Sequence, residues 1–309
     1  MADTPDLDQL AGIPTTFGGY KILELIDKLG GARVFLVRQA SVDRLVTLTV
    51  LPKPEEGKAA FKKRFERQVE AASRLNHPNV VCAVDAGSVE GHRYIASEYA
   101  GGERLQACLT RGEWFGIRRT VSMALDIAHA LAHLESRRVL HRGLTPQAVI
   151  LAESGVAKLR GFSLSRLLGE DGSQTWFDVD AYAARYMSPE IARSDRIIDS
   201  RADIYSFGCV LYHVLTGRPP FPGKLSHEVM KQQIEELPPE PNELRDDLPE
   251  ALRGVLMKCL RKDPALRYRN AIELVADLKA VQKGEPTGPA ARPRQRKRGW
   301  LKRVFTTDE

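Results

Sequence analysis

The chain has 309 residues, of which 43% are hydrophobic and 28% are charged, as in an ordinary globular protein. It has no run of about 18 or more apolar residues, and its acidic N-terminus lacks an apolar segment, so we expect neither a membrane span nor a secretory signal. Its four cysteines are widely spaced without a CxxC pair, which is typical of reduced core residues in a cytosolic protein. The formal net charge of +6 divides into +5 from residue 283 onward and +1 before it.

The first hundred residues contain short apolar runs that are separated by turn-forming residues. Residues 1–19 are rich in Pro, Gly and small polar side chains, which predicts a flexible leader. A charged stretch at residues 58–75 predicts one helix, which ends at the N-H-P-N turn that follows it. Apolar and β-branched runs predict strands at residues 20–26, 34–37, 44–51, 80–84 and 94–99.

Beyond a Gly-containing joint at residues 100–102, the chain is predicted to be mostly helical. Apolar residues recur with a helical period in the first of these segments, and the second is almost wholly apolar, which indicates a buried central helix. The four predicted helices cover residues 120–138, 203–216, 249–260 and 270–281. The order of strands and helices predicts an α+β fold with two lobes. A small antiparallel sheet with one helix covers about residues 20–100, and a larger helical lobe covers about residues 101–282.

Three motifs follow one another in the C-terminal half: Y-M-S-P-E at 186–190, D-I-Y-S-F-G at 203–208 and L-R-K-D-P-A-L-R-Y at 260–268. They resemble the A-P-E, D-x-[WY]-S-x-G and K-D-P-x-x-R motifs of the Hanks-type (eukaryotic-like) serine/threonine protein kinases of bacteria. The resemblance covers about residues 20–282 and implies the bilobal protein-kinase-like fold. It also implies structural roles: Glu190 pairs with Arg267, and Asp203 caps the backbone of the catalytic loop.

Residues 140–151 read L-H-R-G-L-T-P-Q-A-V-I-L and resemble the kinase catalytic loop H-R-D-L-K-P-x-N. In that family the Asp is the base, the Lys assists and the Asn holds a magnesium ion. The base position here is Gly143, the Lys position is Thr145 and the metal-ligand position is Ala148. The resemblance therefore implies that this loop keeps its scaffold and has lost its chemical side chains.

A second motif, K-L-R-G-F-S-L at residues 158–164, resembles K-L-x-D-F-G-L. It places Gly161 where the family has a metal-binding Asp. Phe162 and His141 match the apolar spine that joins the lobes, although both also fit an ordinary core. Arg142 would be available to pair with a phosphate on residues 163–185, with a solvated loop arginine as the alternative.

The residues that should surround ATP are also altered. The run L-G-G-A-R-V at residues 29–34 is interpreted as a glycine loop about three residues too short, with Ala32 at its third glycine. The strand motif V-A-[IL]-K reads V-T-L-T, so Thr49 replaces the Lys and Thr47 replaces the Ala, while Gln68 replaces the helix Glu. Arg33 and Arg38 are candidate substitutes for the Lys. A nucleotide pocket would comprise Gly30, Gly31, Val34, Thr47, Ser97 and Ile150.

These substitutions together predict a pseudokinase that is not an enzyme and that scaffolds or allosterically regulates a protein partner, such as an active kinase. No metal and no cofactor are expected. One alternative is an atypical ATP-dependent phosphotransferase or nucleotidyltransferase that uses relocated carboxylates, with Asp178 and Asp180 as candidates. The other is a nucleotide sensor that binds ATP without magnesium.

The C-terminal region differs from the rest of the chain. Residues 283–309 contain a Gly- and Pro-rich linker and then the basic tail, which we define as residues 292–305. The basic tail has seven Lys or Arg within twelve residues, followed by Trp300, Leu301, Val304 and Phe305. This pattern suits an anionic membrane surface or an acidic partner, with nucleic acid disfavoured and a disordered solubilising tail as the alternative. We therefore expect a cytoplasmic protein that is peripheral at the inner membrane face if the basic tail binds there.

Overall fold

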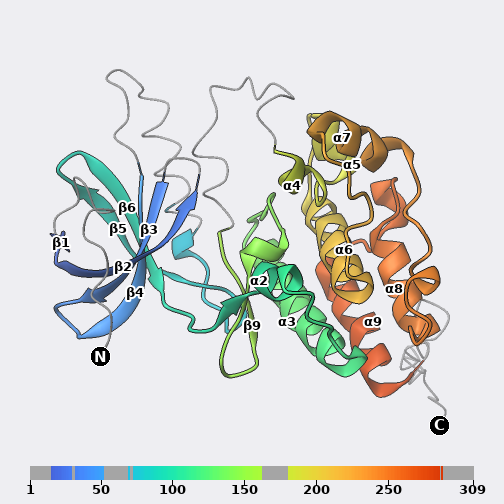
Figure 1. Cartoon of the computed structure of the whole chain (residues 1–309), viewed down its shortest axis with the longest axis horizontal. Helices are drawn as coiled ribbons and strands as arrows, with labels where there is room; N and C mark the ends of the chain where they lie inside the picture. Colours follow the sequence, from blue (N-terminus) through green and yellow to red (C-terminus); the bar gives the residue numbers. More distant parts are fainter. Residues whose placement is uncertain are drawn as a thin grey trace, which may run out of the picture.

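The computed structural model describes residues 15–29, 32–51, 69, 72–161, 180–285 and 287. Figure 1 shows a strand-rich lobe at one end of the molecule and a helical lobe at the other. This arrangement confirms the predicted α+β fold with two lobes. Within the described residues, no helix is long and apolar enough to span a membrane.

The N-terminal lobe is built on a six-stranded antiparallel sheet in the spatial order β1-β2-β3-β4-β6-β5. Its strands are β1 (Thr16–Phe17), β2 (Tyr20–Leu29), β3 (Ala32–Gln39), β4 (Arg44–Val50), β5 (Ala83–Val89) and β6 (His92–Glu98). Phe35, Val37 and Leu48 are fully buried in its core, because aromatic and branched apolar side chains pack well on a pleated surface. The sheet begins earlier than the predicted residue 20, since β1 pairs with β2 and Phe17 is buried.

The C-terminal lobe surrounds one buried helix, α6 (Ser200–Thr216). The Asp199 carboxylate caps its first turn by accepting from Arg201 N–H, and Gly217 ends it in the left-handed conformation, with φ +76°. Helices α3 and α8 pack against it. The other helices are α2 (Leu105–Thr110), α3 (Ile117–Ser136), α4 (Ala181–Ala184), α5 (Pro189–Ala192), α7 (Ser226–Glu235), α8 (Glu250–Cys259) and α9 (Ala271–Lys283), and short 3-10 turns are η2 (Pro146–Ala148), η4 (Pro241–Glu243) and η5 (Pro264–Leu266).

The four helices predicted in this lobe correspond to α3, α6, α8 and α9. The sequence did not predict α7, whose buried face contains only Val229, Met230 and Gln233 and therefore lacks a continuous apolar stripe. The helix predicted over residues 58–75 lies largely outside the described residues.

A small sheet of β7 (Glu103–Arg104), β8 (Val149–Leu151) and β9 (Ala157–Leu159) lies between the two lobes (Figure 1). Leu159 at the end of β9 exchanges backbone hydrogen bonds with the segment before β5: its N–H donates to Asn79 O at 2.8 Å, and its carbonyl accepts from Val81 N–H at 2.8 Å. The buried Asn79 amide also donates to Ala157 O at 3.1 Å. These bonds attach the first lobe to the residues that precede Gly161.

Candidate functional site

One buried carboxylate holds the loop that resembles a kinase catalytic loop. Asp203, in the first turn of α6, accepts hydrogen bonds from His141 N–H and from Arg142 N–H, each at 2.7 Å. Burial raises the pKa of Asp203 to about 6, while the two donors favour its ionised form. Asp203 therefore ties the start of α6 to the loop backbone.

The loop backbone is strained where Asp203 holds it. Arg142 has φ +58°, in the left-handed region, which costs a residue with a side chain about 1–2 kcal/mol. The two hydrogen bonds to Asp203 stabilise this conformation. The Arg142 side chain is exposed, but residues 163–179, most of the segment whose phosphate it was predicted to bind, lie outside the described residues.

His141 joins this loop to the residue before Gly161. Its Nε2 lies 3.0 Å from Arg160 O, and Gly143 N–H donates to its Nδ1 at 3.3 Å. Both contacts fit a neutral ring that donates from Nε2 and accepts at Nδ1. Burial lowers the pKa of His141 to about 4, so the ring is neutral at pH 7. His141 is therefore a buried connector between two loops.

The positions predicted for the base and the metal ligands lie close together in the chain fold but carry no side-chain oxygen. Ala148 is buried, accepts from Arg160 N–H at 2.8 Å through its carbonyl, and donates its own N–H to Thr145 O at 2.9 Å. Gly161 is exposed with φ +76°, and a Cβ added there would meet no described atom within 4 Å. Gly143 likewise offers only backbone groups. These residues do not fit a magnesium ion at the family's usual place, because that ion needs oxygen ligands.

No other metal site is evident in the part of the chain that the structure describes, where no group of three or more His, Cys, Asp or Glu is placed to hold an ion. The two spare carboxylates considered from the sequence differ in their placement. Asp180 accepts from Ala183 N–H at 2.6 Å and caps α4. Asp178 lies outside the described residues.

On the N-terminal lobe, three residues of the predicted nucleotide pocket, Val34, Thr47 and Ser97, share one face of the sheet with Thr49. Val34 pairs with Thr49, and Thr47 pairs with Ser97, and directly opposed residues in antiparallel strands lie on the same face. The Thr47 hydroxyl donates to Ser97 O at 3.3 Å, and Thr49 is buried. Ile150 belongs to β8 of the small sheet. A neutral threonine thus occupies the position where the family has a phosphate-binding Lys.

Neither arginine suggested as a substitute for that Lys is placed to replace it: Arg33 lies on the opposite face, and Arg38 shares the face of Val34 but lies far from it along β3. Arg33 is adjacent to Val34 on β3, and successive side chains of a strand point to opposite faces. Arg38 forms an exposed ion pair with Asp43 at 3.0 Å, at the other end of the same strand. The remaining predicted site residues, Gly30, Gly31, Gln68 and Phe162, lie outside the described residues.

The prediction of a shortened glycine loop is wrong. Strands β2 and β3 pair continuously to Leu29 and Ala32, and Asp27 lies opposite Val34. Counting back from Val34 with the spacing G-x-G-x-x-G-x-V places the three glycine positions at Asp27, Leu29 and Ala32. The loop therefore has its full length, and other residues replace its glycines. The prediction aligned the motif on the adjacent Gly30 and Gly31, which do not occupy its glycine positions.

Asp27 is the charged residue that the sequence analysis missed. Its carboxylate reaches Arg104 of β7 at 2.9 Å and Arg160 at 3.7 Å. These residues are far apart in the chain, and only the adjacency of Arg160 to Gly161 could have drawn attention to one of them. A negative side chain thus occupies the first glycine position, where it would repel a nucleotide phosphate.

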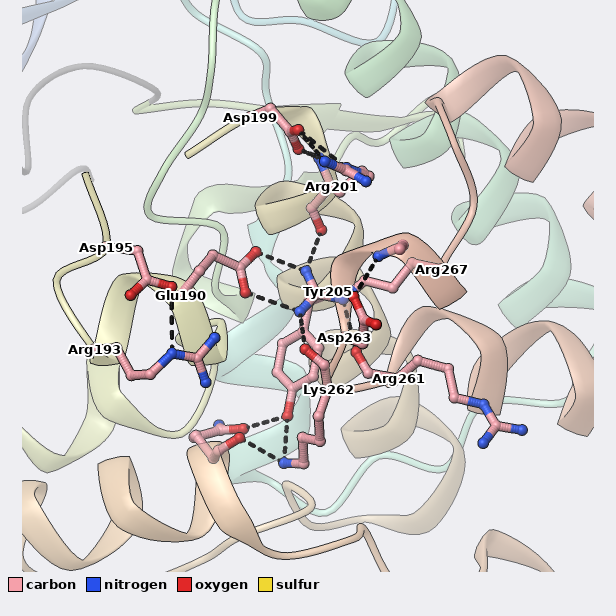
Figure 2. A network of polar contacts seen from close by, with 12 residues as sticks. Glu190, Arg193, Asp195, Asp199, Arg201, Tyr205, Arg261, Lys262, Asp263 and Arg267 are labelled. Atoms are coloured by element: carbon pink, nitrogen blue, oxygen red, sulfur yellow. Dashed lines mark hydrogen bonds and ion pairs between the residues drawn. The ribbon is translucent and has the colours of Figure 1, made fainter. Parts of the chain in front are cut away.

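Glu190 and Arg267 form a buried ion pair, which Figure 2 shows with its neighbours. The two guanidinium ends donate to Glu190 at 2.7 and 2.8 Å. The other donors of Arg267 reach the backbone carbonyls of three residues, Arg201, Lys262 and Arg261. The Arg267 guanidinium also lies over the Tyr205 ring, 4.8 Å from its centre. This network joins α5, α6 and the segment before α9.

Comparisons with known proteins agree with this architecture. The family described as "Protein kinase domain" matches residues 20–277. The chain is 34% identical over 272 residues to the serine/threonine-protein kinase PknB of Mycobacterium tuberculosis, which covers 86% of this chain and 43% of that protein. It is 32% identical over 284 residues to a probable serine/threonine-protein kinase of Streptomyces coelicolor, covering 90% of this chain and 42% of that protein. The chain thus spans less than half the length of these relatives.

Among solved structures, the PknI kinase domain of Mycobacterium tuberculosis aligns with a TM-score of 0.68 and 26% identity, covering 87% of this chain and 97% of that one. The relatives named above are serine/threonine-protein kinases, which points to an enzyme and contradicts the prediction that the chain is not one. That prediction rested on single positions, whereas the relatives are similar over most of the domain. The chain belongs to the protein kinase family, and bacterial serine/threonine-protein kinases are among its relatives.

Proposed function

We propose that this kinase-family domain scaffolds or allosterically regulates a partner protein, and that an active kinase is one such partner. The observation that supports the proposal is a division between two sets of residues. Asp203 and the Glu190–Arg267 pair make the buried contacts that hold a kinase fold together. Gly143 and Gly161, by contrast, offer no side chain where the family's chemistry needs a carboxylate.

The physical argument concerns the usual route of phosphoryl transfer. That route depends on positioning and on charge neutralisation by metal ions and cations. Loss of one such group typically lowers the rate at least about 100-fold, or roughly 3 kcal/mol of barrier. Any phosphoryl transfer by this chain therefore uses residues other than those of the usual route.

Such transfer is the second candidate function, and the names of the relatives favour it. It would make the chain an atypical ATP-dependent phosphotransferase or nucleotidyltransferase. A weaker form of the same idea is a sensor that binds ATP without magnesium. Both require a nucleotide to bind beside Asp27, so a nucleotide-induced rise in melting temperature supports them, and the absence of any rise counts against them.

A transfer assay with labelled ATP separates the two candidates. The usual groups are restored by four substitutions: Thr49→Lys, Gly143→Asp, Ala148→Asn and Gly161→Asp. We expect this variant to transfer phosphate at least about 100-fold faster than the original chain. The matched control keeps Gly143 and carries the other three substitutions, and it should lose most of that gain. An original chain that transfers as fast as the restored variant would establish the second candidate.

The regulatory role is tested against active kinases of the same organism. The purified chain is mixed with each Hanks-type kinase in turn, and the transfer rate of the kinase is measured with and without it. We expect at least one kinase to bind the chain and to change its rate. If none binds, or if binding changes no rate and recruits no substrate, the proposal is wrong.

The proposal also places the domain on the cytoplasmic side of the membrane, where the basic tail could bind an anionic membrane surface or an acidic protein. The excess of Lys and Arg in this stretch supports that placement, since basic residues near an anionic surface contribute about 1 kcal/mol each. The basic tail lies outside the described residues, so this part rests on the sequence alone.

A further inference from the structure

Three charged side chains meet between the lobes, and we call them the interlobe cluster: Asp27, Arg104 and Arg160. Asp27 lies near the end of β2 in the N-terminal lobe. Arg104 belongs to β7 of the small sheet, and Arg160 directly follows β9 of the same sheet. Nη2 of Arg104 lies 2.9 Å from Oδ2 of Asp27 and also donates to Ile26 O at 3.3 Å.

The interlobe cluster is more enclosed than a surface ion pair. Its side chains are 14%, 29% and 18% exposed for Asp27, Arg104 and Arg160. Burial and the neighbouring positive charge of Arg104 lower the pKa of the Arg160 guanidinium, which nonetheless stays protonated at neutral pH. An attraction between charges is screened less in such a place than at an open surface.

The charges of the interlobe cluster are unequal. Two guanidinium groups converge on one carboxylate oxygen, which leaves an excess of one positive charge. The Arg160 contact, at 3.7 Å, is longer than a hydrogen bond, so Asp27 satisfies Arg160 by charge and not by a donated N–H. A guanidinium is a planar fork that suits the paired oxygens of phosphate or carboxylate groups. A ligand with several phosphate oxygens would match both arginines better than one carboxylate does.

We propose that Arg104 and Arg160 form a binding site for a polyphosphate group that Asp27 fills in the absence of a ligand, so that an incoming polyphosphate displaces Asp27 and releases β2 from the small sheet. This rests on the second candidate function, in which a nucleotide binds beside Asp27, and it names the residues that would hold the phosphates. The site needs no divalent metal. It couples the occupancy of the interlobe cluster to the contact between the lobes.

The test measures tripolyphosphate binding by calorimetry with EDTA present. Asp27→Asn removes the competing charge and keeps the size of the side chain, so it should bind tripolyphosphate at least about tenfold more tightly than the original chain. The matched control is Asp43→Asn, which removes the exposed partner of Arg38 on the same sheet and should leave binding unchanged. Adding Arg104→Gln and Arg160→Gln to Asp27→Asn should abolish the gain.

Two further arms identify what is bound and whether the lobes separate. ATP should gain affinity in Asp27→Asn as tripolyphosphate does, while adenosine should not, which assigns the gain to the phosphates. Hydrogen exchange of the β2 amides in the original chain should accelerate when tripolyphosphate is added. If Asp27→Asn does not fold, Arg104→Gln with Arg160→Gln in the original chain should lose its tripolyphosphate binding. Equal affinities in Asp27→Asn and the original chain, or a gain that persists without the two arginines, would overturn the proposal.

Discussion

The buried pair of Glu190 and Arg267 allows a stability prediction with a definite size. Arg267→Met keeps an unbranched side chain but removes five donated hydrogen bonds, two to Glu190 and three to backbone carbonyls. At about 1 kcal/mol of net stabilisation each, these bonds amount to about 5 kcal/mol. Breaking a buried ion pair from one side costs about 3–5 kcal/mol, which agrees. We expect the melting temperature to fall by about 10–20 °C, at roughly 2–4 °C for each kcal/mol.

Calorimetry and urea unfolding measure this change, and two variants control it. Asp195→Asn breaks the exposed pair with Arg193 in the same region (Figure 2) and should leave the melting temperature nearly unchanged. Glu190→Leu combined with Arg267→Met should recover part of the loss, because it removes the unpaired buried carboxylate. An Arg267→Met variant that unfolds at the same urea concentration as the original chain would refute the reasoning.

Three further predictions concern other parts of the chain. Burial lowers the pKa of His141 to about 4, so the free energy of unfolding should fall as the pH drops from about 6.5 toward 4. In urea titrations, His141→Gln should reduce that fall, whereas substitution of the exposed His227 by Gln should not. Gly102 has φ +102°, and a Cβ there would clash with the carbonyl oxygen of Leu151 in β8. A Cβ at Gly101 would meet no described atom, so Gly101→Ala should cost only about 1 kcal/mol of stability. Urea unfolding should show that Gly102→Ala costs several-fold more than Gly101→Ala. The basic tail should carry the chain into the pellet with anionic vesicles, and a 1–283 truncation should stay in the supernatant; equal pelleting would remove the membrane hypothesis.

The two-lobed fold could be predicted because its signals are local. Helices such as α6 are marked by an apolar run and by a Gly just past the last residue, and both features lie within one short window of sequence. The contacts of Asp203 and of the Glu190–Arg267 pair were expected only because short motifs resemble a known family. The helix α7 was missed because two apolar side chains and a Gln form its buried face, which periodicity does not detect.

The interlobe cluster could not be predicted for a different reason. Asp27, Arg104 and Arg160 come from three separate elements, and charged side chains have no periodic pattern that reports a distant partner. The glycine loop was assigned to the wrong residues because the adjacent glycines at 30 and 31 resemble the motif, whereas the positions with the correct spacing carry no glycine. The register becomes clear only when Asp27 is seen opposite Val34 across the hairpin. The correct spacing is present in the sequence, and the pairing of β2 with β3 shows which of the two readings is right.

Asp203 and the Glu190–Arg267 pair match the family's motifs, but folding alone explains why the chain has them, so they say little about its function. Asp203 accepts from two loop N–H groups, and a buried N–H without a partner costs about 1–3 kcal/mol. A stable fold therefore requires this residue whatever chemistry the domain performs. Gly161 is likewise explained in part by its backbone, because φ +76° is a left-handed conformation that favours glycine. The ion pairs of Asp27 are different, because they join β2 to Arg104 and Arg160 at the place where the family binds its phosphates. The response of Asp27→Asn to tripolyphosphate therefore tests the function of this chain more directly than any residue it retains for its fold.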